Sequence, residues 1–394
     1  MILMGALIAL PGFVMGCKLN QALGTAGSVF ASFGGGFVLA CIATAAAVVG
    51  ARSRLSSYAL VIRAFGELGG KVVNAVLSLV MVGWFAVVAA LFGDAVMHTG
   101  ANALPISTRG WVAIGCVIMI ATTSIGFRAL DILALFTTPL KVLLLSVTVF
   151  AALSKARGID LWEPPLHPAL TLPQGVSFVV GGVIVGALLT PDLARLASSK
   201  AQAALACFIG FAVGLPLVLV LAGIPAKLTG MSDLVEIMMR LGLGLPALLV
   251  VILAAWSSNA YNLYAITLVY RTLADLPHWK LAAIGGAFGA VMAVAGIARQ
   301  LTPYLLLLGI AIPPIAGVYL SAYYTSWVLD EKPLKTTWRP DSFGAWMIGV
   351  VFAALEAPLH FSLTGIVAVD SLLVSIAAYL ILHLLPRTWS RVQR

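Results

Sequence analysis

The sequence predicts an integral membrane protein made entirely of α-helices. Of its 394 residues, 61% are apolar and only 9% are charged, whereas a soluble domain has about 25% charged residues. So few charged residues are not enough to cover the water-facing surface of a soluble protein of this length. The apolar residues form continuous runs instead of alternating with a period of two, which excludes a β-barrel. Helices satisfy their own backbone hydrogen bonds in lipid, so a helical bundle follows.

Twelve apolar runs have the length of a bilayer crossing, which takes roughly 20 helical residues. They cover residues 1–25, 29–50, 71–97, 109–127, 129–153, 174–197, 201–226, 246–274, 279–297, 303–328, 342–359 and 364–386. We expect the first five helices (1–153) and the next five (174–328) to form two inverted repeats, with two further helices at 342–386. Together they form a single transporter domain.

The basic residues indicate the orientation of these helices. If both termini are cytoplasmic, the cytoplasmic segments carry fifteen Lys or Arg and the opposite loops carry six. Positive residues concentrate in cytoplasmic loops, so we expect a multi-pass protein of the inner (plasma) membrane with both termini in the cytoplasm. The net charge is +9. The basic residues lie between the apolar runs, so this charge does not indicate nucleic-acid binding. The partners expected are the lipid bilayer and a small-molecule substrate, with no obligatory protein partner.

The segment Val14–Cys17 faintly resembles a lipoprotein cleavage site. No Lys or Arg precedes the apolar run, as a signal peptide requires, so we expect no cleavage. The four cysteines all fall in apolar runs without a pairing pattern and are expected to be small buried hydrophobic residues.

Two predicted helices contain glycine-rich breaks in matching positions of the two repeats. The first carries Pro11-Gly12, and the sixth carries Gly181-Gly182 and Gly186 before Thr190-Pro191. Broken helices at corresponding positions are typical of transporters that bind substrate near the membrane centre. Glycine also serves close helix packing, which is the alternative interpretation. We expect helices 1 and 6 to be discontinuous.

The eighth helix has the densest polar cluster, Trp256–Asn262. Spacing of three to four residues puts Ser258 and Asn262 on one helix face, with Ser257 and Tyr261 on the adjoining one. Hydroxyl and amide oxygens coordinate hard cations, so a Na⁺ site is favoured over simple interhelical hydrogen bonding.

Two lysines interrupt the apolar runs. Lys141 lies near the centre of the fifth helix, where a charge is costly and usually functional. It is either a group that exchanges a proton and replaces Na⁺, or a lysine that pairs within the bundle or extends to the membrane surface. Lys18, in the first helix, either attracts an anionic substrate or has no special role.

Five short motifs, in order along the chain, resemble the nucleobase:cation symporter-1 family and, within it, the bacterial cytosine permeases. They are Leu23-Gly24-Thr25, Val82-Gly83-Trp84-Phe85, Leu189-Thr190-Pro191-Asp192, Trp256-Ser257-Ser258-Asn259 with Asn262-Leu263-Tyr264, and Ala311-Ile312-Pro313-Pro314. The resemblance implies a 5+5 inverted-repeat core with two additional helices, and transport by alternating access.

The resemblance also implies roles for individual residues. Trp84 stands where a family tryptophan stacks on the substrate, and Phe13, beside Gly12 at the first break, matches a substrate-contacting aromatic. Ser257 and Ser258 match the hydroxyl pair that binds Na⁺, and Asn259 matches an asparagine close to that site. Asp192 and Arg195 fit a structural pair or gate at the cytoplasmic end of helix 6.

The pocket departs from the cytosine permeases at positions that read the edge of the base. Met81 replaces an amide one turn before Trp84, Ala254 replaces an asparagine, and Gly182-Val183 replaces a Ser-Phe pair. A site built to hydrogen-bond a polar group discriminates strongly against ligands that lack it. In the same way, a site that has lost these hydrogen-bonding groups should bind cytosine weakly. This argues against cytosine as the best substrate.

The sequence therefore predicts a permease for a nucleobase-like planar nitrogen heterocycle, coupled to Na⁺ or H⁺. A carrier of an amino-acid-like or other small polar metabolite, proton-linked or uncoupled, is the alternative. An enzyme is not expected: there is no HExxH or GxSxG motif, and the histidines lack ligand spacing. No cofactor is expected besides the coupling ion.

Overall fold

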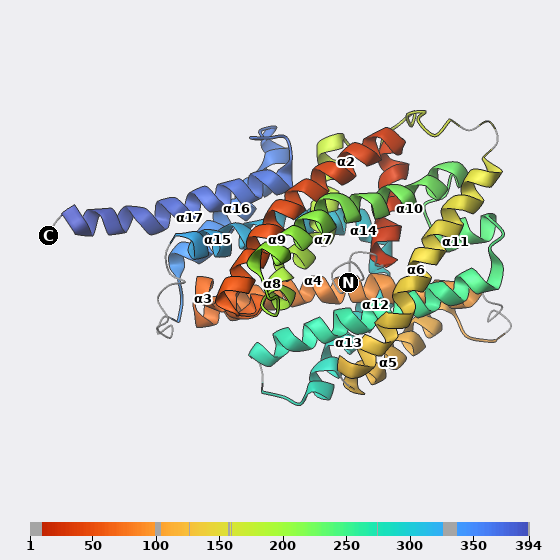
Figure 1. The fold of residues 1–394 in the computed structure, drawn as a ribbon, viewed down its shortest axis with the longest axis horizontal. Helices are drawn as coiled ribbons and strands as arrows, with labels where there is room; N and C mark the ends of the chain where they lie inside the picture. The colour runs from red at the N-terminus through yellow and green to blue at the C-terminus, as the bar shows by residue number, and fades with distance from the viewer. Residues whose placement is uncertain are drawn as a thin grey trace. The chain divides into compact units, whose positions relative to one another are not determined.

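The computed structural model describes residues 10–98, 104–125, 127–156, 158, 160–273, 275–325 and 337–392. Within these ranges the chain is helical and contains no strand (Figure 1). Eight described helices are long and apolar enough to cross a membrane, and three shorter apolar helices accompany them. The all-helical class is confirmed, and each predicted span is mostly helical where it is described.

The first two predicted spans form one long helix, α2 (Leu10–Ser53), with a kink at Gly24. Gly24 has φ 71° and ψ 176°, a conformation that favours glycine. A Cβ atom there would also lie 2.7 Å from Cδ of Pro165. The predicted break at Pro11-Gly12 falls in the first helical turn of α2, and the residues before Leu10 lie outside the described part.

The rest of the first half contains four helices. They are α3 (Ser57–Phe65), α4 (Glu67–His98), α5 (Thr108–Ile125) and α6 (Phe127–Lys155). α6 contains Pro139.

The second half contains more interruptions. Its elements are α7 (Leu172–Leu188), α8 (Thr190–Ala194), α9 (Lys200–Ile209), the π-helix η2 (Gly210–Gly214), α10 (Leu215–Thr229), α11 (Leu234–Arg240), α12 (Gly244–Leu273), α13 (His278–Val294), the 3₁₀-helix η3 (Ile297–Gln300), α14 (Leu301–Ala311), α15 (Pro313–Tyr324), α16 (Pro340–Leu359) and α17 (Val367–Val392).

The position predicted for the break in the sixth span was wrong. α7 continues through Gly181, Gly182 and Gly186 and ends only before Leu189. A Cβ atom at Gly181 would meet the backbone of α14, at the Leu305 carbonyl oxygen and at Gly309 N, the latter 2.7 Å away. This glycine therefore permits close helix packing. A second interruption separates α14 from α15 at Ile312, before Pro313, because proline lacks an N–H donor and disfavours helix at the preceding residue.

The chain forms two compact units. The first contains Met1–Ser32, Ser78–Thr171 and Gly214–Thr302, and the second contains Phe33–Leu77, Leu172–Val213 and Pro303–Arg394. Each unit draws on both predicted repeats, so the repeat boundaries stay a prediction. Gly182 and Val183 belong to the second unit, and the other predicted site residues belong to the first.

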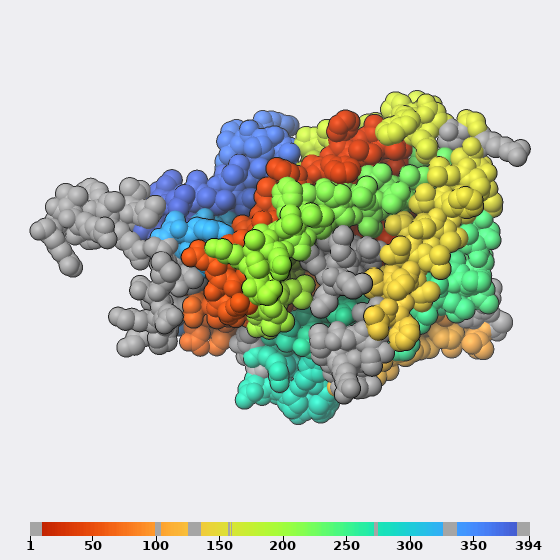
Figure 2. All heavy atoms as spheres, in the orientation of Figure 1, coloured from red at the N-terminus to blue at the C-terminus, as the bar shows by residue number. Residues whose placement is uncertain are grey.

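Within the first unit, α6 exposes a row of large apolar side chains. Leu135, Phe136, Leu143 and Phe150 are all exposed, and α6 lies at the surface in the view of Figure 2. Such a surface is unfavourable in water and suits lipid contact.

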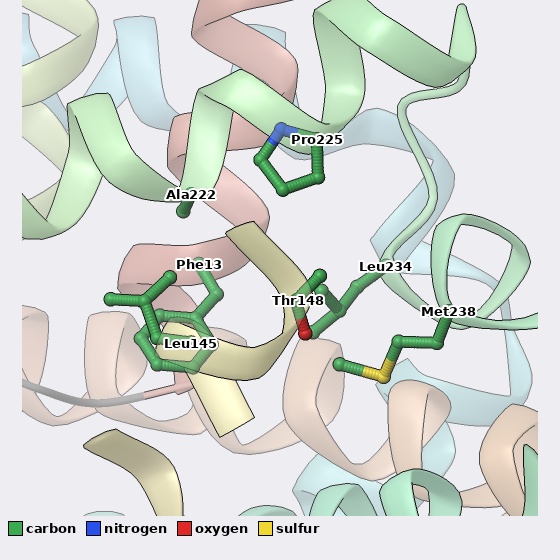
Figure 3. A pocket seen from close by; sticks show the side chains of 7 residues that line it. All are labelled: Phe13, Leu145, Thr148, Ala222, Pro225, Leu234 and Met238. Atoms are coloured by element: carbon green, nitrogen blue, oxygen red, sulfur yellow. The ribbon is translucent and has the colours of Figure 1, made fainter. Parts of the chain in front are cut away.

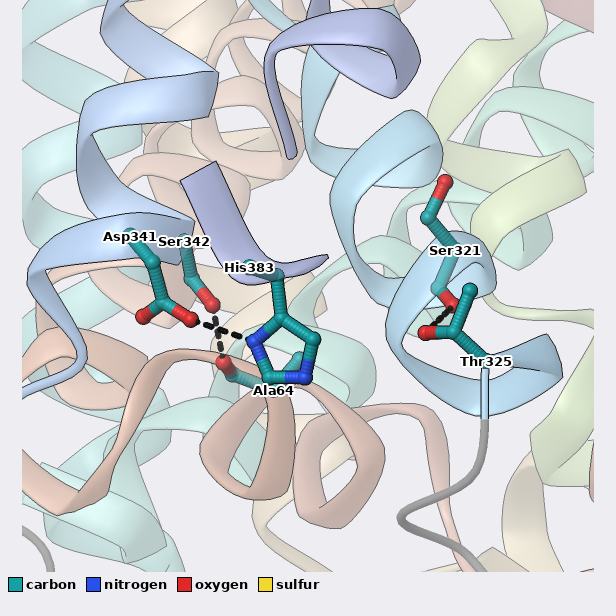
Figure 4. A network of polar contacts seen from close by, with 6 residues as sticks. All are labelled: Ala64, Ser321, Thr325, Asp341, Ser342 and His383. Atoms are coloured by element: carbon teal, nitrogen blue, oxygen red, sulfur yellow. Dashed lines mark hydrogen bonds and ion pairs between the residues drawn. The ribbon is translucent and has the colours of Figure 1, made fainter. Parts of the chain in front are cut away.

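In the second unit, polar contacts fasten α16 and α17 to their neighbours (Figure 4). Ser342 donates to the Ala64 carbonyl oxygen of α3 at 2.6 Å. His383 Nδ1 of α17 lies 2.7 Å from Asp341 Oδ2 of α16. Asp370 of α17 accepts from Ser362 and from Thr364 in the turn between the two helices. These contacts hold the C-terminal helices as a hairpin.

Three further hydrogen bonds in the second unit join the short helix α3 and the residue Arg54 before it to α8 and the residues that follow α8. Asp192 Oδ1 of α8 accepts from Ser57 N at the start of α3, at 2.8 Å. In return, Arg54 donates to the carbonyl oxygens of Arg195 and Ala197, at 2.6 and 2.8 Å. Each residue satisfies backbone groups that a helix end leaves unpaired. Asp192 also stays beside Arg195, whose Nε donates to the Asp192 carbonyl oxygen at 3.3 Å. That the two residues form a structural pair or gate stays a prediction.

Candidate functional site

A buried polar cluster lies where α6 packs against α12 in the first unit. Thr137 and Lys141 project from one face of α6 because they are four residues apart, and they meet Ser257 and Ser258 of α12. Thr137 donates to Ser257 Oγ at 2.9 Å, and Lys141 Nζ donates to Ser258 Oγ at 3.3 Å. All four side chains are buried. The structure therefore brings together the three residues that the sequence predicted for cation binding or coupling.

Lys141 is held inside the protein. Its side chain is 4% exposed, and its ammonium reaches a hydroxyl on a neighbouring helix. Lys141 does not extend to the membrane surface, whereas the pairing within the bundle that the sequence left open is present. No Asp or Glu of the described residues lies within 4.0 Å of this ammonium. A buried ammonium bonded to a neutral hydroxyl resembles a bound cation with an oxygen ligand.

Thr137 was missed by the sequence analysis. Its hydroxyl donates to the hydroxyl of Ser257, which in turn donates to the Ala254 carbonyl oxygen at 3.4 Å. The hydroxyl of Ser257 therefore has protein partners on both sides. The signal available in the sequence was a hydroxyl residue one helical turn before the intramembrane lysine.

Asn259 connects three helices of the first unit. Its Nδ2 donates to the Phe85 carbonyl oxygen of α4 at 2.8 Å and to Met119 Sδ of α5 at 3.3 Å. Its Oδ1 accepts from Asn262 at 3.2 Å, and the side chain is fully buried. A substrate contact would need these bonds to be exchanged, so the structure favours a positioning role for this residue.

The predicted substrate residues of the first unit are mostly buried. Trp84 directly precedes Phe85, which accepts from Asn259, so this bond anchors the part of α4 that carries Trp84. Trp84 is 6% exposed and Ala254 is 1% exposed. Met81, one turn before Trp84, is half-buried. Gly12 is buried in the first turn of α2.

Phe13 lines a small, mainly apolar pocket in the first unit (Figure 3). The other lining residues are Leu145, Thr148, Ala222, Pro225, Leu234 and Met238. They come from α6, α10 and α11. In the second unit, Gly182 and Val183 are half-buried on α7.

The described residues contain no cluster of three or more His, Cys, Asp or Glu that could hold a metal ion. The chemistry available at the α6–α12 contact is therefore that of hydroxyls and one amine, which exchange protons or bind a monovalent cation.

Two curated proteins that match this sequence are both named cytosine permease. The chain is 28% identical to the cytosine permease of Escherichia coli (strain K12) over 337 residues, which covers 85% of this chain and 78% of the permease. The cytosine permease of Escherichia coli O157:H7 matches with the same identity and coverage. Over most of its length, this chain is similar to the cytosine permeases. The resemblance stated from its motifs is confirmed, although no family profile matches the sequence.

Solved structures support the same fold. An inward-facing conformation of Mhp1 aligns with a TM-score of 0.82 at 17% identity, covering 98% of this chain and 90% of Mhp1. A closed conformation of Mhp1, a nucleobase-cation-symport-1 family transporter with bromovinylhydantoin bound, aligns with a TM-score of 0.78 at 18% identity, covering 97% and 91%. The protein is a multi-pass membrane transporter, and the expectation that it is not an enzyme agrees with relatives that are permeases and transporters.

Proposed function

We propose that this protein imports a planar nitrogen heterocycle and couples its uptake to protons through Lys141. The observation that carries the coupling is the bond from Lys141 Nζ to Ser258 Oγ at 3.3 Å. Ser258 is one of the two hydroxyls that the family resemblance assigns to Na⁺. The ammonium supplies a fixed positive charge at the place where the resemblance expects a bound Na⁺, which is free to leave.

Proton exchange at this lysine gives a physical route to alternating access. The charged amine donates to Ser258 and so ties α6 to α12. The neutral amine is a weaker donor, because hydrogen bonds from ionised groups are roughly twice as strong. Loss of the proton therefore loosens the contact between the two helices. Reprotonation from the opposite side of the membrane restores it.

The proposed substrate class rests on Trp84 and on the relatives. An indole face holds a flat ring by stacking, and the compared proteins are named for cytosine or hold a hydantoin. Cytosine itself is disfavoured, because Met81, Ala254 and Gly182 carry no side-chain group that hydrogen-bonds its edge. Both termini are proposed to be cytoplasmic in the inner membrane, on the bias of fifteen to six basic residues.

The test is uptake of radiolabelled heterocycles by proteoliposomes, with and without Na⁺ and an inward proton gradient. The wild type should accumulate substrate in Na⁺-free medium when the gradient is present. Lys141→Met should lose that response yet still exchange internal for external substrate. Strict Na⁺ dependence of the wild type, with normal coupling in Lys141→Met, would instead restore a Na⁺ symporter.

The alternative, a carrier of an amino-acid-like metabolite, is tested in the same assay. Competition by amino acids, with no competition by purines, pyrimidines or hydantoins, would establish it.

A further inference from the structure

The turn between α16 and α17 is built around one carboxylate. Asp370 is fully buried and accepts four hydrogen bonds from the turn. Its Oδ2 accepts from Ser362 Oγ at 2.6 Å and from Leu363 N at 2.9 Å. Its Oδ1 accepts from Thr364 N at 3.0 Å and from the Thr364 hydroxyl. A carboxylate has about four lone-pair positions, so donors already fill those of Asp370. Such donors favour the ionised form of a carboxyl group, so Asp370 carries the charge here.

A second acid, Glu356, lies beside this turn near the end of α16. Its side chain is 5% exposed, and its carboxyl group lies close to the side chains of Asp370 and Ser362. Glu356 Oε1 has no hydrogen-bond partner among the described residues. In the same part of the chain, no Lys, Arg or His lies within 4.0 Å of either carboxyl group. The hairpin therefore buries two neighbouring acids without a basic partner.

Of the charged groups on the elements around α16, Asp370 is the one that acts electrostatically on Glu356. α3, α15 and α17 pack against α16, and α17 runs beside it in Figure 1. Asp341 and His383 bond to each other at the opposite end of the hairpin, about 22 Å along α16 from Glu356. His360, which follows α16, has an exposed side chain. The remaining titratable residues described on these elements are Tyr319, Tyr323 and Tyr324 of α15, Tyr379 of α17, and Tyr58 and Arg63 of α3.

We propose that Glu356 holds a proton at neutral pH and forms, with Asp370, a proton-binding site separate from Lys141. Two neighbouring carboxylates repel each other, and an ionised carboxylate buried without partners is costly. Because donors already fill Asp370, the proton belongs to Glu356. Ser362 Oγ accepts from Gly365 N at 2.7 Å and keeps one lone pair, to which the neutral acid can donate. The donors then run from Glu356 through Ser362 to Asp370.

Loss of this proton places a second negative charge beside Asp370. The repulsion acts where α16 ends and the turn begins, so deprotonation should weaken the hairpin formed by the last two helices. A metal cation is the other way to neutralise two carboxylates, but Asp370 has no lone pair left to bind one. The site involves neither Lys141 nor Ser258, so its test does not depend on the proposed function.

Infrared spectroscopy of the purified full-length protein tests where the proton is. A protonated carboxylic acid and a carboxylate absorb at different frequencies, so the spectrum of the wild type minus that of Glu356→Gln isolates this side chain. At pH 7 the difference should contain the band of a protonated acid. Glu67→Gln is the matched control. Glu67 is exposed and bonded to Lys71, so its difference spectrum should contain only carboxylate bands at pH 7.

The melting temperature shows what the proton does for the hairpin. Gln is the neutral analogue of a protonated Glu, so Glu356→Gln should melt within about 2 °C of the wild type at pH 7. At the alkaline pH where the acid band is lost, the wild type should melt about 5 °C below Glu356→Gln, because two carboxylates then repel each other. Glu67→Gln should follow the wild type at both pH values.

The proposal is overturned if the Glu356→Gln difference spectrum contains carboxylate bands at pH 7, as the control does. If those bands also shift on addition of Na⁺ or Ca²⁺, the pair binds a metal cation instead of a proton. A wild type that melts no lower than Glu356→Gln after losing the acid band would show that the proton does not stabilise the hairpin. An acid band at pH 7, lost together with the melting temperature, establishes the site.

Discussion

Lys141 on α6 donates to the hydroxyl of Ser258 on α12 across a distance of 3.3 Å. A Na⁺ bound to that hydroxyl at about 2.4 Å, a typical cation–oxygen distance, would lie within about 6 Å of the ammonium. At an effective dielectric constant of about 20, the two charges would repel by about 3 kcal/mol. That repulsion corresponds to a roughly hundredfold loss of Na⁺ affinity. A charged Lys141 and a tightly bound Na⁺ therefore exclude each other at this site.

We predict that Lys141→Met makes the purified protein more stable while removing proton coupling. The substitution keeps the length of the side chain but eliminates a buried charge, and replacing buried charges by apolar groups is often neutral or stabilising. A gain of about 1 kcal/mol would raise the melting temperature by roughly 2–4 °C. Ser258→Ala, which instead leaves the ammonium without its hydroxyl, should lower it. A lower melting temperature in Lys141→Met would show that the amine has a structural role.

The Trp84 ring is predicted to carry a large part of substrate affinity. Stacking of a base on an aromatic side chain contributes about 1–3 kcal/mol, so Trp84→Ala should weaken binding by roughly 5- to 150-fold. Trp84→Phe keeps a ring, so its substrate affinity should lie between those of the wild type and Trp84→Ala. Binding is measured by competition on purified protein, with Trp279→Ala, an exposed tryptophan on α13, as the control. Equal affinity in wild type and Trp84→Ala would remove the stacking role.

Asn259 is predicted to act through the position of α4. Asn259→Ala leaves the Phe85 carbonyl oxygen without this donor and Asn262 without its acceptor, so the melting temperature should fall by several degrees, consistent with about 1–3 kcal/mol for unpaired buried groups. Substrate affinity should fall too, because Trp84 is then less firmly held. If Asn259→Ala loses affinity with no loss of stability, the side chain contacts substrate directly.

How far the sequence predicts this structure depends on which contacts decide each feature. The helices follow from long apolar runs, and the sequence identified Lys141 and Ser258 separately. That they bond to each other depends on how α6 and α12 are rotated about their axes, which neither helix encodes alone. The glycine pair in α7 suits a break and a close contact equally, and only the approach of Leu305 on α14 decides between them.

The short helix α11 was not predicted, because seven residues are too few for an apolar pattern to stand out. A local signal was nevertheless present. Asp233 is followed three residues later by Glu236, the spacing of a helix-capping pair, and Asp233 does cap the helix.

Restoring an amide at position 81 is predicted to improve cytosine recognition. Met81 is half-buried and leaves room for a side chain of similar length, so Met81→Gln should raise cytosine affinity severalfold, consistent with about 0.5–1.5 kcal/mol for one net hydrogen bond. Ala254 is 1% exposed, and a larger polar residue there would not fit the packed core. Met81→Leu is the matched control and should leave the affinity for cytosine unchanged. Submicromolar competition by cytosine in the wild type would show that the missing polar groups are not needed.

The bonds between α3 and α8 are predicted to act as one clamp. Asp192→Ala removes the acceptor for Ser57 N, and Arg54→Ala leaves the carbonyl oxygens of Arg195 and Ala197 unpaired. Each should lower stability by about 0.5–2 kcal/mol, the range for losing a helix cap, or roughly 1–8 °C in melting temperature. Because the three bonds hold the same two segments together, the second substitution should cost less once the first is made. A double-mutant cycle should therefore give a coupling energy above about 0.5 kcal/mol, whereas Arg54→Ala combined with Lys227→Met in the other unit should be additive. Additivity of Arg54→Ala and Asp192→Ala would show that the two ends of the clamp hold independently.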